Sequence, residues 1–276
     1  MTGWPEVYST CFGTERPFLF YTDGVCYNSD WGTGRRTNRG RIFTACPRRT
    51  QGGKVYPMND CGTEQPERGR SVYRYGSPDA SIVLIEPIHV PDGMEEEAEM
   101  IRKLTGLDFY MLAVKVDWYR DLSPWQAPAV SGNIPFGDGA EETLEQILKL
   151  TGDPEKRYIL GGYSMGGLFA LWAACRSAAF SAIAAASPSV WFPGFAEYMT
   201  SGTVQAGCVY LSLGDREEKT RNPMMATVGK RIREIHAWLQ AQAVSCRLEW
   251  NEGNHFKDLE ERMAKGFAWA MKELNK

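Results

Sequence analysis

The sequence lacks the features that would direct it to a membrane or to nucleic acid. It has no run of about 18 apolar residues, so we expect no membrane-spanning helix. The N-terminus has no charged region followed by an apolar run, so we expect no signal peptide. The formal net charge of the 276 residues is only −3, which provides no strong field for binding nucleic acid. An apolar content of 43% instead fits an ordinary soluble globular protein, whose oligomeric state stays open.

Regularly spaced cysteines are also missing. The chain has seven cysteines, an odd number, and their spacing matches no zinc-binding pattern. We therefore expect no metal site, no cofactor and a cytoplasmic location, where cysteines stay reduced. Four cysteines lie between residues 11 and 61, so a disulfide remains possible in that segment.

Short apolar runs alternate with segments of helical composition from about residue 79 onward. The predicted strands are 81–86, 109–116, 157–163, 180–186, 209–213 and 246–250. The predicted helices are 94–105, 140–150, 166–176, 222–243 and 259–274. This alternation predicts an α/β fold with a mostly parallel central sheet and helices on both faces.

The first 78 residues have a different pattern. Segments 18–21 and 72–75 are plausible strands, whereas 24–70 is rich in Gly, Arg, Asn and Thr and has few periodic apolar positions. We predict antiparallel edge strands with long loops here. The length suits one α/β domain over residues 1–276, with its functional core in 79–276.

A G-x-S-x-G motif, Gly162-Tyr-Ser-Met-Gly166, lies between a predicted strand and a predicted helix. A serine hydroxyl is a weak nucleophile that must stand exposed where a base can reach it, and a tight strand–helix turn provides that. The helix N-terminus also directs free N–H groups toward a developing oxyanion. We therefore predict Ser164 as a nucleophile and the N–H of Met165 as an oxyanion donor. A junction that merely needs small residues is the alternative.

Histidine is scarce, which narrows the search for a base. The chain has three: His89, His236 and His255. His236 falls inside a predicted long helix, where it is poorly placed. His255 follows the last predicted strand, at the sheet edge where Ser164 should lie, and is the predicted base. His89 follows the strand 81–86 and is a candidate to line the pocket or to help bind the oxyanion.

A carboxylate that orients the base should follow the strand 209–213. Asp215, Glu217 and Glu218 are the candidates there, and their spacing alone does not choose among them. Each of them also fits an ordinary solvated position.

Together these segments resemble the esterase D-like family of α/β hydrolases. The likeness covers roughly residues 80–276 and lies in segments 160–170, 185–192, 211–217 and 253–256. The resemblance implies the α/β-hydrolase fold and favours Glu217 as the acid, because relatives often carry an acidic residue three positions after the glycine that follows this strand. It also implies an oxyanion donor in the loop after strand 81–86. Pro87 has no N–H, so Ile88 is the better candidate.

The expected function is hydrolysis of a carboxylic ester through an acyl-enzyme on Ser164. Four aromatic residues on predicted rim loops are candidates for an acyl- or aryl-binding wall: Trp118, Trp125, Trp191 and Phe192. Ordinary packing under long loops would place them equally well. Two alternatives stay open: an acyltransferase that uses the same residues, and a non-catalytic binding module of the same fold.

Overall fold

The computed structural model describes residues 21–22, 25–26, 63–67, 70–130 and 132–276. The chain divides into two units, Met1–Tyr56 and Pro57–Lys276. In the first unit, β1 (Tyr21–Thr22) pairs antiparallel with β2 (Val25–Cys26). The rest of the predicted strand 18–21 and the possible disulfide of segment 11–61 lie outside the described residues. That all 276 residues form one domain remains a prediction.

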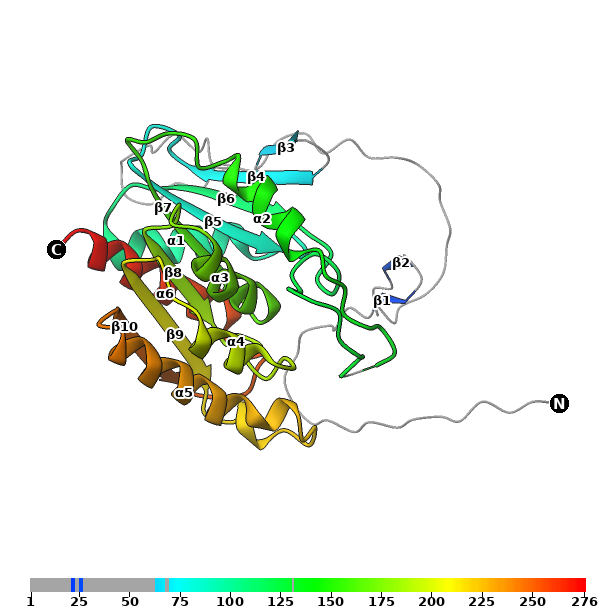
Figure 1. Cartoon of the computed structure of the whole chain (residues 1–276). Helices are drawn as coiled ribbons and strands as arrows, with labels where there is room; N and C mark the ends of the chain where they lie inside the picture. Colours follow the sequence, from blue (N-terminus) through cyan, green and yellow to red (C-terminus); the bar gives the residue numbers. More distant parts are fainter. Residues whose placement is uncertain (1–20, 23–24, 27–62, 68–69, 131) are drawn as a thin grey trace. The chain divides into compact units, whose positions relative to one another are not determined.

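An eight-stranded sheet forms the centre of the second unit (Figure 1). Its strands are β3 (Thr63–Glu67), β4 (Arg70–Gly76), β5 (Ile82–Ile88), β6 (Tyr110–Lys115), β7 (Arg157–Tyr163), β8 (Ala182–Ala186), β9 (Cys208–Gly214) and β10 (Ser245–Asn251). The spatial order is β10-β9-β8-β7-β5-β6-β4-β3. The strands from β10 to β6 are parallel, whereas β4 and β3 join antiparallel at one edge. The predicted mostly parallel central sheet is confirmed.

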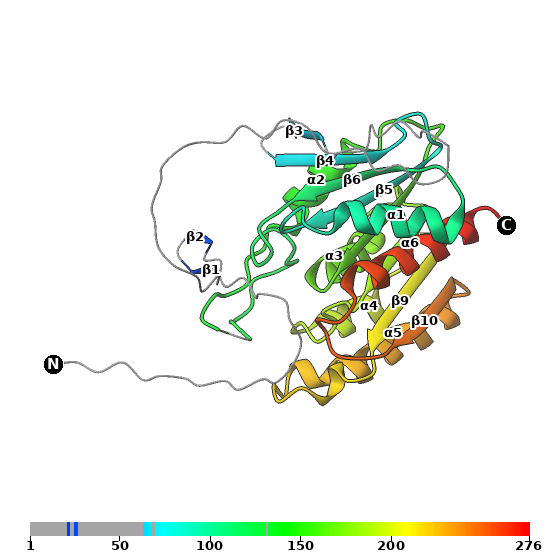
Figure 2. The same ribbon diagram turned by 180° about the vertical axis from the view of Figure 1, so that it is seen from behind.

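Helices cover both faces of this sheet. One face carries α2 (Ala140–Leu148), α3 (Met165–Arg176), α4 (Phe195–Ser201) and α5 (Val228–Ala241), and the opposite face carries α1 (Met94–Thr105) and α6 (Leu259–Leu274) (Figures 1 and 2). Every residue of β5 and of β9 is buried, as expected for strands packed on both sides. No helix in the described part of the chain is both long and apolar enough to span a bilayer.

Two helical segments differ from the sequence prediction. The helix expected from residue 222 begins only at Val228, after a 3₁₀ turn at Met225–Thr227. Asn222 explains the delay, because its side-chain oxygen accepts the N–H groups of Met224 and Met225 in a turn. The short helix α4 was not predicted; it follows Gly194, whose φ of 77° starts the new direction.

The strand order reverses between β5 and β7. From β5 the chain proceeds to β6 on one side, and then to β7 on the other side. In open α/β sheets, ligands bind outside the carboxyl ends of the strands at such a switch point. The residues that follow β7 are Ser164 and Met165, so the topology places the predicted nucleophile there.

Candidate active site

Ser164 forms the sharp turn between β7 and α3. Its backbone has φ 53° and ψ −116°, a conformation that is costly for a residue with a side chain. Its carbonyl oxygen accepts the N–H groups of Leu168 and Ser189, and its own N–H donates to Ala186. These bonds hold the strained turn, which exposes the hydroxyl at the end of the sheet.

Gly162 permits this turn. A Cβ atom on Gly162 would lie 2.3 Å from the carbonyl carbon of Gly166, so no larger residue fits. A Cβ on Gly166 would come no closer than 3.4 Å to its nearest neighbour, the Pro87 carbonyl oxygen. The close approach between strand and helix therefore depends mainly on the first glycine of the motif.

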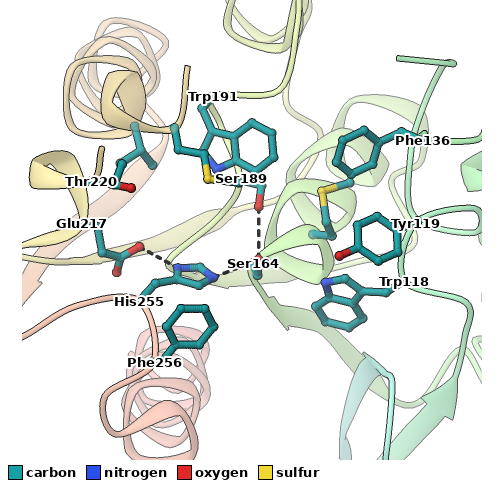
Figure 3. A pocket seen from close by; sticks show the side chains of 13 residues that line it. Trp118, Tyr119, Phe136, Ser164, Ser189, Trp191, Glu217, Thr220, His255 and Phe256 are labelled. Carbon is teal, nitrogen blue, oxygen red and sulfur yellow. Dashed lines mark hydrogen bonds and ion pairs between the residues drawn. The ribbon is translucent and has the colours of Figure 1, made fainter. Parts of the chain in front are cut away.

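His255 lies in the loop between β10 and α6, with its imidazole between Ser164 and Glu217 (Figure 3). Its Nε2 is 3.0 Å from the Ser164 hydroxyl oxygen, and its Nδ1 is 2.7 Å from Glu217 Oε2. The backbone carbonyl of His255 accepts a 2.7 Å hydrogen bond from the Tyr163 hydroxyl. Three segments distant in sequence thus meet in one chain of hydrogen bonds.

The three acidic candidates have different partners. Glu217 faces His255 and is 7% exposed. Asp215 accepts the N–H of Gly253 at 2.7 Å and so supports the histidine loop rather than the imidazole. Glu218 points away, to the exposed Arg233. Geometry therefore separates candidates that sequence spacing left open.

Glu217 is held as a carboxylate. Burial favours its neutral form, but hydrogen bonds from His255, Ser187 and Gly214 outweigh burial and lower the pKa of Glu217. The Ser187 hydroxyl and the Gly214 N–H each donate to Oε1 at 2.7 Å. Oε2 therefore stays directed at His255.

A cavity of about 330 Å³ opens beside the Ser164 hydroxyl. Trp118, Tyr119 and Phe136 lie on one side of Ser164, opposite His255 and Glu217 (Figure 3). The described lining also includes Met165, Ser189, Trp191, Thr220, Met225, Val228 and Phe256. The Ser189 hydroxyl lies 3.2 Å from that of Ser164. The cavity is thus mostly aromatic and apolar, with the polar groups gathered at one end.

Solved structures share this architecture. The siderophore hydrolase EstA from Aspergillus nidulans matches with a TM-score of 0.59 at 20% identity, over 81% of this chain and 99% of its own. An IroE-like serine hydrolase from Shewanella oneidensis gives a TM-score of 0.61 at 15% identity, over 77% and 80% of the two chains. The enterobactin esterase FES from Shigella flexneri gives 0.56 at 15% identity, over 78% of this chain and 60% of its own. The chain has the α/β-hydrolase fold. No family model matches the sequence, and the comparison with curated proteins found no relative.

The two predicted oxyanion donors lie at the carboxyl ends of the neighbouring parallel strands β7 and β5. Met165 is the first residue of α3 and lines the cavity. Ile88 is the last residue of β5, in register with Lys115, and its carbonyl accepts from Val116. His89 is exposed and, like Ile88, is not among the described residues that line the cavity. His236 lies within α5, as predicted.

The four predicted aromatic residues form two layers. Trp118 and Trp191 line the cavity, whereas Trp125 and Phe192 pack behind it. Phe136 joins the layers, with its ring centroid 5.2 Å from that of Phe192 and 6.2 Å from that of Trp191. The sequence did not point to Phe136, Tyr119, Ser189 or Phe256 as site residues. Phe256 directly follows the predicted base His255, and this position in the sequence could have indicated that it lies at the site. Its side chain is 78% exposed.

Arg262 is a further residue that the sequence analysis missed. It lies in α6, is 1% exposed, and its Nη1 is 3.1 Å from Glu217 Oε1. The sequence could have indicated it, because Arg262 is a charged residue on the apolar face of that helix, beside Met263, Gly266 and Phe267.

Proposed function

We propose that this chain is a serine esterase, related to the esterase D-like hydrolases, that cleaves carboxylic esters through an acyl-enzyme. The observation that carries the proposal is the hydrogen-bonded series Ser164–His255–Glu217, with heavy-atom distances of 3.0 Å and 2.7 Å, at the end of a cavity. A nucleophile, a base and a group that orients the base are the parts that acyl transfer to serine requires.

In the proposed reaction, the Ser164 hydroxyl attacks the ester carbonyl while His255 Nε2 takes its proton. Glu217 keeps the second ring proton on Nδ1 and stabilises the imidazolium that forms. The N–H of Met165, at the N-terminus of α3, is the proposed oxyanion donor from the helix. Ile88 as the second donor remains a prediction from the family resemblance.

His255 then returns the proton to the leaving alcohol, and water releases the acid from Ser164 by the reverse sequence of steps. The aromatic lining of the cavity suits an acyl or aryl group better than a charged one. The structural neighbours, a siderophore hydrolase and an enterobactin esterase among them, support ester cleavage as the reaction class.

The proposal includes a cytoplasmic location and no cofactor. Cys175, Cys208 and Cys246 are free. Burial raises the pKa of Cys175 to about 11 and of Cys208 to about 12, so both thiols stay protonated and unreactive.

Hydrolysis of p-nitrophenyl esters of increasing acyl length tests the reaction. We expect Ser164→Ala to lose at least about a thousandfold in turnover, because it removes the hydroxyl that forms the acyl-enzyme. Ser201→Ala, an exposed serine at the end of α4, is the matched control and should keep wild-type rates. A fluorophosphonate should label the wild type and not Ser164→Ala.

Equal rates in wild type and Ser164→Ala would contradict the esterase proposal, and an unlabelled wild type would favour a binding module. A product that forms only when an alcohol acceptor is added would instead identify an acyltransferase. Covalent labelling does not separate ester hydrolysis from acyl transfer, because both use the same acyl-enzyme.

A further inference from the structure

Arg262 occupies an unusual position for an arginine. It is 1% exposed, in the second turn of α6, within a helix face that otherwise packs apolar side chains against the sheet. Its Nε atom finds no partner among the described residues. Burying a guanidinium is costly, and a partly unsatisfied one more so, so stability alone gives little reason for an arginine here.

The two terminal nitrogens of Arg262 serve different segments. Nη1 donates to Glu217 Oε1 at 3.1 Å, to the Ser187 hydroxyl at 3.2 Å and to the Tyr163 hydroxyl at 3.1 Å. Nη2 donates to the backbone carbonyls of Glu252 at 3.2 Å and Asn254 at 3.0 Å. One nitrogen therefore contacts the candidate acid, and the other contacts the loop that carries the candidate base.

We propose that Arg262 is a positioning residue that fixes the candidate acid and the loop of the candidate base relative to each other. This inference rests on the proposed esterase function. The planar fork of a guanidinium sets the two contacts at a constant separation, which a single ammonium group cannot do. By binding Oε1, the arginine also leaves Oε2 of Glu217 free for His255.

Tyr163 extends the same connection. Burial raises the pKa of Tyr163 to about 12, so its hydroxyl keeps its proton and donates to the backbone carbonyl of His255. The same oxygen accepts from Arg262 Nη1. Two successive backbone carbonyls of the loop are thus held, that of Asn254 by Arg262 and that of His255 by Tyr163.

The charge of Arg262 has an effect separate from its geometry. A positive charge beside Glu217 opposes protonation of the nearby imidazole, and the proposed reaction needs that imidazole neutral before attack. Removing the charge should therefore move the acid limb of the pH–rate profile to higher pH. Removing only the fork should lower turnover without moving the limb.

Two variants separate these effects. Arg262→Lys keeps the charge and loses the fork, so we expect kcat to fall about tenfold to a hundredfold, KM to stay within about twofold and the acid limb to stay in place. Arg262→Gln loses both, so we expect a similar fall and an acid limb about half a pH unit or more higher. Lys265→Gln, at a half-buried position in the same helix, is the control.

Tyr163→Phe keeps the proposal testable if Arg262→Gln does not fold. It removes one tether and no charge, so kcat should fall severalfold with the acid limb unchanged. Thermal unfolding of every variant reports folding separately. Arg262→Lys and Arg262→Gln that are less stable but keep wild-type kcat and acid limb would overturn the proposal and leave Arg262 with a structural role.

Failure of the esterase proposal gives a different result. A wild type that hydrolyses no ester and takes no fluorophosphonate would contradict the proposed function, and this inference with it. An active, labelled wild type whose Arg262 variants match it in kcat and in pH profile would contradict this inference alone.

Discussion

Helix α6 contacts two groups of buried carboxylates that differ in what surrounds them. At the carboxyl end of β9, Glu217 has Arg262 beside it and four hydrogen-bonding partners on its two oxygens. On the face that α1 and α6 cover, Glu86 of β5 and Glu97 of α1 are 4% and 3% exposed. The charge of Glu260, another carboxylate, also acts on both of them.

The two groups have opposite protonation. Hydrogen bonds overcome burial and lower the pKa of Glu217. Burial instead raises the pKa of Glu86 to about 7, and burial together with the charges of Glu86 and Glu260 raises the pKa of Glu97 well above its usual range. One oxygen of Glu86 and one of Glu97 have no partner among the described residues. Nearby donors and charges, rather than burial, therefore decide which buried carboxyl is ionised.

Removing the charge of Glu217 should have the largest effect, and that effect should be on ester turnover. We expect Glu217→Gln to lose roughly 10²–10⁴ in ester turnover, by analogy with other triads. If the amide nitrogen faces His255, it forces the wrong tautomer for accepting the serine proton. If the amide nitrogen faces the other way, it meets the donors of Gly214 and Arg262. Steady-state kinetics with p-nitrophenyl esters measure this loss.

Glu218→Gln is the matched control for that variant. Glu218 is the next residue and pairs with the exposed Arg233, so its loss should change turnover by less than about twofold. If Glu217→Gln is as active as Glu218→Gln, the contact between Glu217 and His255 does not limit the rate of the reaction.

The sequence predicted much of the fold because local signals bound its elements. The predicted boundaries 94–105, 157–163 and 259–274 match α1, β7 and α6. For α1, Gly93 and Gly106 both adopt positive φ at its ends. The start of α5 could not be predicted in this way, because Asn222 is held in its turn partly by a 2.7 Å hydrogen bond to the carbonyl of Val130, 92 residues away.

The candidate site likewise has residues that the sequence predicts and residues that only long-range contacts reveal. Ser164 and His255 follow from a motif and from chain order, which are local or topological properties. Arg262 meets Glu217 and Tyr163 across 45 and 99 residues, so no spacing rule links them. The pairing of Glu86 with Glu97 is equally invisible, because Glu97 stands in an acidic first turn that looks like an exposed helix start.

Replacing Glu97 should change stability rather than activity. Glu86 and Glu97 keep a proton in the folded state at a pH where the unfolded chain has lost it, so stability should fall as pH rises from about 5 to 8. Through the two groups we expect the wild type to lose about 2–3 kcal/mol of unfolding free energy over this window. Glu97→Gln, whose amide can donate to Glu86 at any pH, should lose less than half of that.

Urea unfolding at pH 5, 6.5 and 8 measures this difference. Glu95→Gln removes an exposed carboxylate from the same turn of α1 and should keep the wild-type pH dependence. If Glu97→Gln and Glu95→Gln have the same pH dependence, the buried carboxyls do not stay protonated in the folded state as we infer.

The smallest expected effect belongs to Glu260→Gln. Glu260 is half-buried in the first turn of α6, where negative charge favours the helix, but it also adds to the charge around Glu86 and Glu97. These effects oppose each other, so the net change in unfolding free energy at pH 8 should stay below about 0.5 kcal/mol. Its signature is in the pH dependence: with one like charge removed, the fall in stability should shift a few tenths of a pH unit lower. Because Glu260 is two residues from Arg262, ester turnover measured on the same variant shows whether the two groups are independent. A loss of turnover would mean that Glu217 and the pair Glu86–Glu97 are coupled through α6. The opposite protonation of the two groups would then depend on the helix that contacts both.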